Sequence, residues 1–238
     1  MTRAAAAAPR LHARARRLLA RRPEAGVYAV AAAAGVAVVG LAAAVPGHHG
    51  APGSVPGAWG LWLLMVLATM LPVVAPQARR LALRSLWTRR HRAITGFLAG
   101  YLALWGVLGV VVAVPVALGP PPVAVTVAVL VAGAAWQVAP PRRRVLTRCG
   151  SARPAPVRGR AADRACVAAG WRAGGRCVVT CGPAMLAMAL AHSLLLMAAL
   201  SALLLHERAR GPNPDRRAGA PEQAWGFLAC AALVAVLG

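Results

Sequence analysis

The chain has 238 residues, of which 59% are hydrophobic, and its mean hydropathy is +0.62. This composition is too apolar for an ordinary soluble domain and indicates a membrane protein. The net charge is +22, and all 27 basic residues are arginines. Because these arginines stand between apolar runs and no recognition motif accompanies them, we expect them to set membrane topology rather than to bind nucleic acid.

Apolar runs separated by basic or Gly/Pro-rich segments predict an all-α, polytopic transmembrane helical bundle of about six spans. A basic tail, residues 1–25, precedes a single transmembrane domain, residues 26–238. The first run is long enough to cross a bilayer, so we expect it to be retained rather than cleaved as a signal peptide. The last run is short for a span, at about 15 residues. The expected spans are residues 26–45, 58–76, 93–118, 123–139, 177–205 and 224–238.

The distribution of arginine predicts the orientation of these spans. With a cytoplasmic N-terminus, the inner segments 1–25, 77–92 and 140–176 hold 23 arginines, and the outer segment 206–223 holds the other four. Because cytoplasmic loops carry an excess of basic residues, we predict a multi-pass protein of the bacterial inner (plasma) membrane. We expect residues 140–176 to form a long, poorly ordered basic loop. The inner loops are expected to contact anionic lipid headgroups.

The stretch "RCVVTCGPAMLAMALAH", residues 176–192, places five side chains that suit soft metals in the fifth apolar run. On a helix they share about 80° of arc and form a stripe about 22 Å long. Thiol, thioether and imidazole donors favour Cu(I), whereas hard cations need oxygen ligands and zinc seldom takes methionine. In the second span Met65 is expected to face the stripe, while Met70 points about 140° away from Met65. The expected metal ligands are Cys177, Cys181, Met185, Met188, His192 and Met65.

The stripe has other interpretations. Methionine and cysteine also fill apolar interfaces, so the protein could be a non-catalytic scaffold or assembly subunit whose stripe is a packing face. An ionisable His192 inside a span favours a functional role. A disulfide between Cys177 and Cys181 barely fits their spacing on a helix. The tandem His48 and His49 could capture metal or form a solvated turn.

Catalysis is not expected from this chain. Its apolar runs contain almost no carboxylates and no lysine, and no hydrolase, kinase or nucleotide-binding signature is present. A membrane oxidoreductase that uses the metal is a further alternative. For a metal-handling protein, the function would be delivery, storage or transport of Cu(I), with a metal-donor or acceptor protein as partner.

Four motifs occur in order along the chain: "MVLATMLP" from Met65, "FLAGYLALW" from Phe97, "WQVAPPRRRVLTRC" from Trp136 and "GGRCVVTCGPAM" from Gly174. Together they resemble the predicted metal-binding integral membrane proteins grouped as domain of unknown function 2182. The resemblance covers roughly residues 58–205 and implies a metal-binding role without a known reaction. Thr69 and Thr180 stand where that family often has methionine and cysteine, and Gly182 stands where it has tryptophan.

Overall fold

The computed structural model describes residues 22–44, 54–119, 121–148, 158–191, 193–210 and 221–237. Within these ranges all regular structure is helical, which confirms the all-α prediction for this part of the chain. A short 3-10 turn, η1 (Trp87–Arg89), joins two of the α-helices. The α-helices are α2 (Ala25–Ala44), α3 (Val55–Arg84), α4 (Arg90–Leu118), α5 (Val123–Val138), α6 (Pro140–Arg148), α7 (Gly159–Ala191), α8 (Leu194–Ala209) and α9 (Pro221–Leu237).

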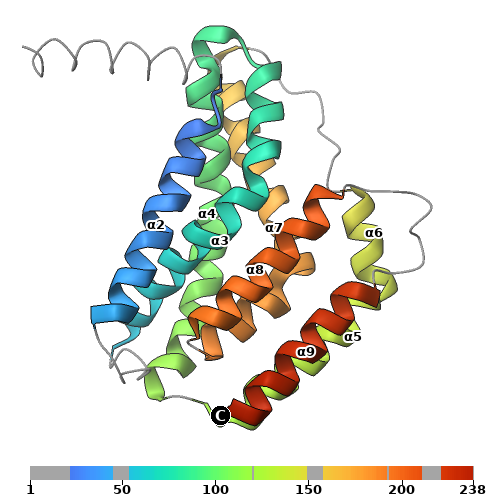
Figure 1. Cartoon of the computed structure of the whole chain (residues 1–238). Helices are drawn as coiled ribbons and strands as arrows, with labels where there is room; N and C mark the ends of the chain where they lie inside the picture. Colours follow the sequence, from blue (N-terminus) through green and yellow to red (C-terminus); the bar gives the residue numbers. More distant parts are fainter. Residues whose placement is uncertain are drawn as a thin grey trace, which may run out of the picture.

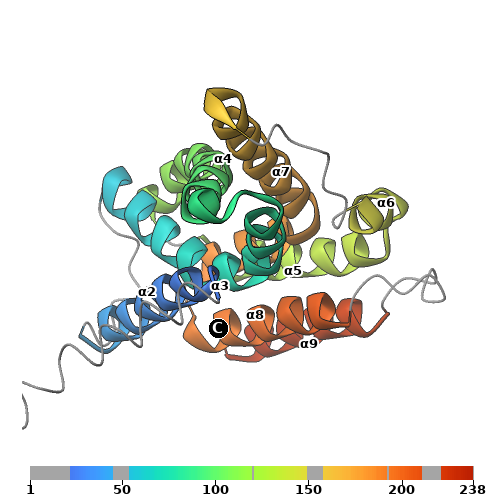
Figure 2. The same ribbon diagram turned by 90° about the horizontal axis from the view of Figure 1, so that it is seen from above.

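The long helix α3 is the centre of the bundle (Figure 1), where it packs against α2, α4, α7 and α8. The indole N–H groups of Trp59 and Trp62 bind it to α4, each donating to a carbonyl oxygen of α4 at 2.9 Å. Helix α5 packs against α7 and α9. Seen from above, α8 and α9 run together along one side of the molecule, with α6 far from α2 (Figure 2).

Four helical segments of the described chain are long and apolar enough to cross a membrane: α2, α3, η1 with α4, and α7. Helix α5 and the first part of α6 would together make a fifth, although they are bent by 65° at the break between them. Helix α9 is apolar but shorter. By length and composition the described residues thus hold four or five candidate spans, where the sequence predicted about six.

The region after α6 differs most from the sequence-based expectation. Helix α7 already begins at Gly159, so much of the expected basic loop 140–176 is helical. The expected fifth span, 177–205, is two helices, because α7 ends at Ala191 and α8 begins at Leu194. Ser193 provides the physical reason for a new start: its hydroxyl accepts a hydrogen bond from the backbone N–H of Leu196 at 3.4 Å, as an N-cap does.

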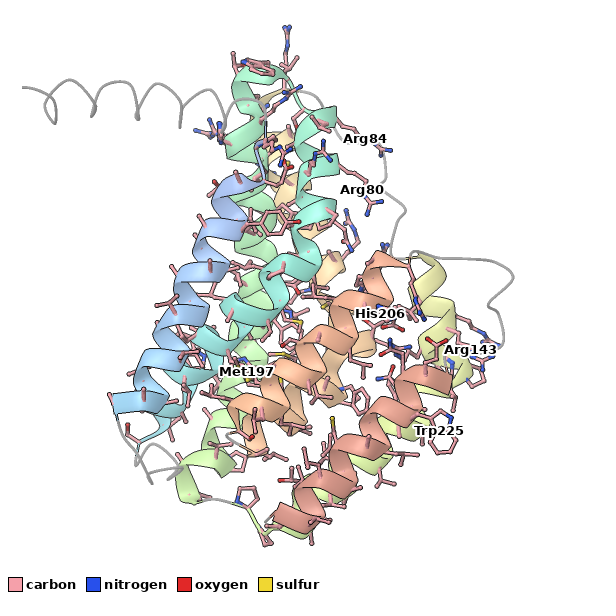
Figure 3. All side chains as sticks on the ribbon, viewed as in Figure 1. Arg80, Arg84, Arg143, Met197, His206 and Trp225 are labelled. Carbon is pink, nitrogen blue, oxygen red and sulfur yellow. The ribbon has the colours of Figure 1, made fainter. Side chains whose placement is uncertain are left out.

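Helix α8 runs back alongside α7 (Figure 1) instead of continuing in its direction. Glu207, near the end of α8, therefore meets Arg142 of α6. The expected placement of residues 206–223 on the outer side does not agree with this contact, which brings the end of α8 to the end of the molecule where α5 meets α6. Figure 3 shows Arg80, Arg84, Arg143 and His206 toward that end. The opposite ends of the helices, within the described residues 54–58, 113–119 and 193–197, contain no Arg, Asp or Glu.

Candidate metal centre

A close approach of two helix backbones positions the candidate site. A Cβ atom added to Gly100 of α4 would lie 2.0 Å from the carbonyl oxygen of Val167, and one added to Gly170 of α7 would lie 1.8 Å from that of Phe97. Only glycine fits at such separations. Small residues that let helix backbones touch are typical of helix pairs in membranes. The contact therefore fixes how α4 and α7 lie against each other.

Tyr101 follows Gly100 and benefits directly from this contact. Its hydroxyl donates a hydrogen bond to Cys177 Sγ of α7 at 3.1 Å. Tyr101 is completely buried and Cys177 is 4% exposed. Sequence analysis missed this partner of Cys177, although Tyr101 belongs to the quoted motif "FLAGYLALW". A buried tyrosine normally requires a hydrogen-bond partner, and that is the signal that could have identified it.

The two cysteines on α7 form a thiol pair. Cys181 follows Cys177 by one helical turn and is 1% exposed. Both are free cysteines, so the structure contains no disulfide between them. A free thiol binds a soft metal once it has lost its proton.

Helix α3 adds sulfur to the thiol pair from the facing side. Cys177 Sγ lies 3.8 Å from Met70 Sδ. Thr69 Oγ1 lies 3.5 Å from Met185 Sδ and 2.8 Å from the carbonyl oxygen of Met65. Met70 and Met185 are both completely buried. The structure thus places the Met70 thioether against Cys177 across the α3–α7 interface, and the Met185 thioether against Thr69 in the same interface.

The expected ligands have different outcomes. Cys177, Cys181, Met185 and Met188 of α7, and Met65 of α3, are all buried in the same hydrophobic core. Met70 belongs to this core too, and its contact with Cys177 differs from the prediction that it points away. The reason is that α3 has helices on several sides, so opposite faces of it are both buried. His192, and the tandem His48 and His49, lie outside the described residues.

A cation lies beside the thiol pair. Arg208 of α8 donates to Thr180 Oγ1 at 3.0 Å and lies 3.9 Å from Cys181 Sγ. Thr180 Oγ1 is itself 3.5 Å from Cys181 Sγ. Sequence analysis missed Arg208 because a single helix over residues 177–205 would carry it far from Cys181. The polar pair His192–Ser193 within an otherwise apolar run is the signal that could have indicated a break.

Arg142 fixes the position of α8 relative to α7. Its side chain is 1% exposed and donates to Glu207 at 2.7 and 2.8 Å. It also donates to the carbonyl oxygens of Thr180 at 3.2 Å and of Gln137 at 3.4 Å. A single guanidinium therefore joins the α5–α6 bend, α7 and α8.

The indole of Trp136 makes a second polar contact between α5 and α7. Pro183 lacks an N–H group and so leaves the Val179 carbonyl without its usual helical partner. Trp136 Nε1 donates to this oxygen at 2.7 Å. The proline thus creates an acceptor on α7 that α5 uses.

The donor set decides which metals the centre can hold. No group of three or more His, Cys, Asp or Glu side chains suited to a metal occurs in the part of the chain that the structure describes. Tetrahedral zinc sites and oxygen-rich sites for hard cations need such groups. Two thiols with nearby thioethers are instead the donors that Cu(I) prefers.

The described part of the chain is all-helical and holds buried sulfur side chains in one core. Its sequence matches the protein family described as PpoB2, copper chaperone, over residues 59–235. This match covers most of the chain and includes Met70, Cys177, Cys181 and Arg208, so the chain belongs to this copper chaperone family. Searches of curated proteins and of solved structures find no match. The grouping with domain of unknown function 2182 stays an expectation, since the matched family carries another description.

Proposed function

We propose that the chain is an integral membrane chaperone that holds Cu(I) between α3 and α7 and passes it to an acceptor protein. The observation that carries this proposal is the buried sulfur contact between the two helices, in which Cys177 Sγ lies 3.8 Å from Met70 Sδ. Membership of the copper chaperone family supports copper as the metal.

The proposed ligands are the thiolates of Cys177 and Cys181 and the thioethers of Met70 and Met185. Cu(I) accepts two to four soft donors, so four sulfur atoms from two facing helices suit it. Met65 and Met188 lie in the same buried core and would receive the metal during transfer. His192, expected from the sequence as a further ligand, lies outside the described residues. A small chain with few metal sites could store little copper, so we favour delivery over storage.

We place the protein in the bacterial inner membrane. The apolar helices α2, α3, α4 and α7 support this location, as does the separation of charged from uncharged helix ends. Basic residues gather on the cytoplasmic side of membrane proteins, so the arginine-rich end would face the cytoplasm and anionic lipid headgroups. We propose no catalytic activity for the chain.

The scaffold alternative also has an observation in its favour. The cysteines and methionines are part of the packed core between α3, α4 and α7, so they contribute to packing whether or not a metal binds. If the protein is a scaffold, conservative changes at the thiols would alter the free energy of unfolding. They would not alter copper binding, because the protein would bind no copper.

Copper analysis of the purified protein under reducing conditions tests the proposal. We expect a single Cu(I) per wild-type chain, and loss of this copper in the Cys177→Ser/Cys181→Ser double variant. Cys230→Ser is the matched control, because Cys230 is a half-buried thiol of α9, a helix that packs mainly against α5 and α8. Equal copper content in the wild type and the double variant would contradict the proposed site. A wild-type chain without copper that purifies with a fixed partner would favour the scaffold.

A further inference from the structure

The return of α8 along α7 brings a positive charge to an apolar site. Arg208 NH2 lies 3.9 Å from Cys181 Sγ, and Thr180 Oγ1 lies close to both groups. Cys181 is 1% exposed, so water contributes little to its surroundings. A guanidinium this close to a buried sulfur atom interacts strongly with any charge that develops there.

Copper binding changes the charge of the thiol pair. When two thiols bind Cu(I), two protons leave and the complex of one copper ion with two thiolates has a net charge of −1. An uncompensated charge in an apolar interior is costly and needs a partner of opposite sign. The neighbouring thioethers of Met70 and Met185 are neutral and cannot supply it.

We propose that Arg208 is the counter-ion of the copper-loaded thiol pair, and that it favours monovalent over divalent metals at this site. The inference rests on the proposed function. Arg208 is a positioning residue here: it stabilises the charge of the complex and does not ligate the metal. Arg142 supports this role, because its bonds to Glu207 and to the Thr180 carbonyl keep the end of α8 beside Cys181.

The test compares two metals of the same coordination preference but different charge. Hg(II) also binds two thiolates, but the resulting complex is neutral. We expect Arg208→Met to lower the Cu(I) affinity about 30-fold, which is less than the loss for a fully buried charge pair because Arg208 is only partly buried. The Hg(II) affinity of the same variant should change less than about threefold, since a neutral complex needs no counter-ion. Competition with a copper-specific chelator and with a small dithiol measures the two affinities.

Two variants serve as controls. Arg208→Lys keeps the charge and should recover most of the Cu(I) affinity. Arg210→Met removes a nearby arginine that pairs with Glu222 at the exposed end of α8, and should leave both affinities unchanged.

The outcomes separate the counter-ion role from the proposed function. Equal loss of Cu(I) and Hg(II) affinity in Arg208→Met would show a merely structural role and overturn the inference. Wild-type Cu(I) affinity in this variant would overturn it too, while copper loss in the double cysteine variant would still uphold the proposed site. Retention of copper by the double cysteine variant would reject the site and the counter-ion together.

Discussion

The thiol pair on α7 has two very different neighbours. On one side, α4 meets α7 through glycines whose backbones touch, and Tyr101 of α4 donates a hydrogen bond to Cys177. On the other side, α5, α6 and α8 meet α7 through Trp136, Arg142 and Arg208. The first interface depends on shape and the second on hydrogen bonds and charge. The α4–α7 backbone contact therefore positions the candidate ligands, while the contacts of α6 and α8 with α7 supply the charge around them.

The shape-dependent interface should be the most sensitive to added volume. Gly100→Leu places a side chain where the Val167 carbonyl already lies 2.0 Å from the Cβ position. We expect a loss of more than about 3 kcal/mol, because overpacking that cannot be relieved by side-chain movement forces the helices apart. Thermal unfolding in detergent measures it. Gly60→Ala in α3 is the control, because no atom lies within 4 Å of the added Cβ, and its effect should stay within about 1 kcal/mol. Equal effects would contradict the close contact.

The polar interface should respond most strongly to loss of Arg142. In the native pair the side chain of Arg142 is 1% exposed and that of Glu207 is 13% exposed. Arg142→Met leaves the Glu207 carboxylate without this partner. Removing one member of a buried pair costs about 3 kcal/mol. The Arg142→Met/Glu207→Gln double variant should recover part of this loss, because no charge is then left unpaired. Additive losses in denaturant-unfolding measurements would show that the two groups do not interact.

The two methionines of α3 should differ in copper affinity. Met70→Leu conserves volume but removes the sulfur next to Cys177, and we expect a tenfold loss of Cu(I) affinity, about 1.4 kcal/mol. Met65→Leu should have a smaller effect, because within the described residues it is Met70 Sδ, not Met65 Sδ, that contacts Cys177 Sγ. Chelator competition measures both. A larger effect for Met65 would restore the ligand assignment made from the sequence.

The smallest effect concerns Trp136. Trp136→Phe removes the hydrogen bond to the Val179 carbonyl and should cost about 1 kcal/mol. In a Pro183→Ala background the helix regains an N–H group for that carbonyl, so the same substitution should cost less. An unchanged cost in thermal unfolding would indicate that the indole acts through packing alone.

The sequence predicted most helices because apolar runs long enough to cross a membrane satisfy their backbone hydrogen bonds as helices. The ends of α2, α4 and α5 lie within a few residues of the expected limits. The break between Ala191 and Leu194 was not predicted, because the hydropathy of the surrounding residues hardly changes there. It depends on the capping hydroxyl of Ser193, which is a local effect that a hydropathy pattern does not register.

The burial of Cys177, Cys181, Met185 and Met188 in one core was predictable, because these residues share one face of α7. The positions of Met70 and Arg208 were not, and for different reasons. An angular argument assumes that a helix has one functional face, whereas α3 is packed on several sides. The position of Arg208 depends on the reversal of α8, which is a tertiary feature. The positions of both residues therefore could be found only from the three-dimensional structure.

The most direct test of the central claim is copper X-ray absorption spectroscopy of the Cu(I)-loaded wild-type protein. A centre built from Cys177, Cys181, Met70 and Met185 predicts a first coordination shell made of sulfur alone. A Cys177→Ser/Cys181→Ser sample should show no bound copper. A first shell made mainly of nitrogen or oxygen would contradict a sulfur site between α3 and α7.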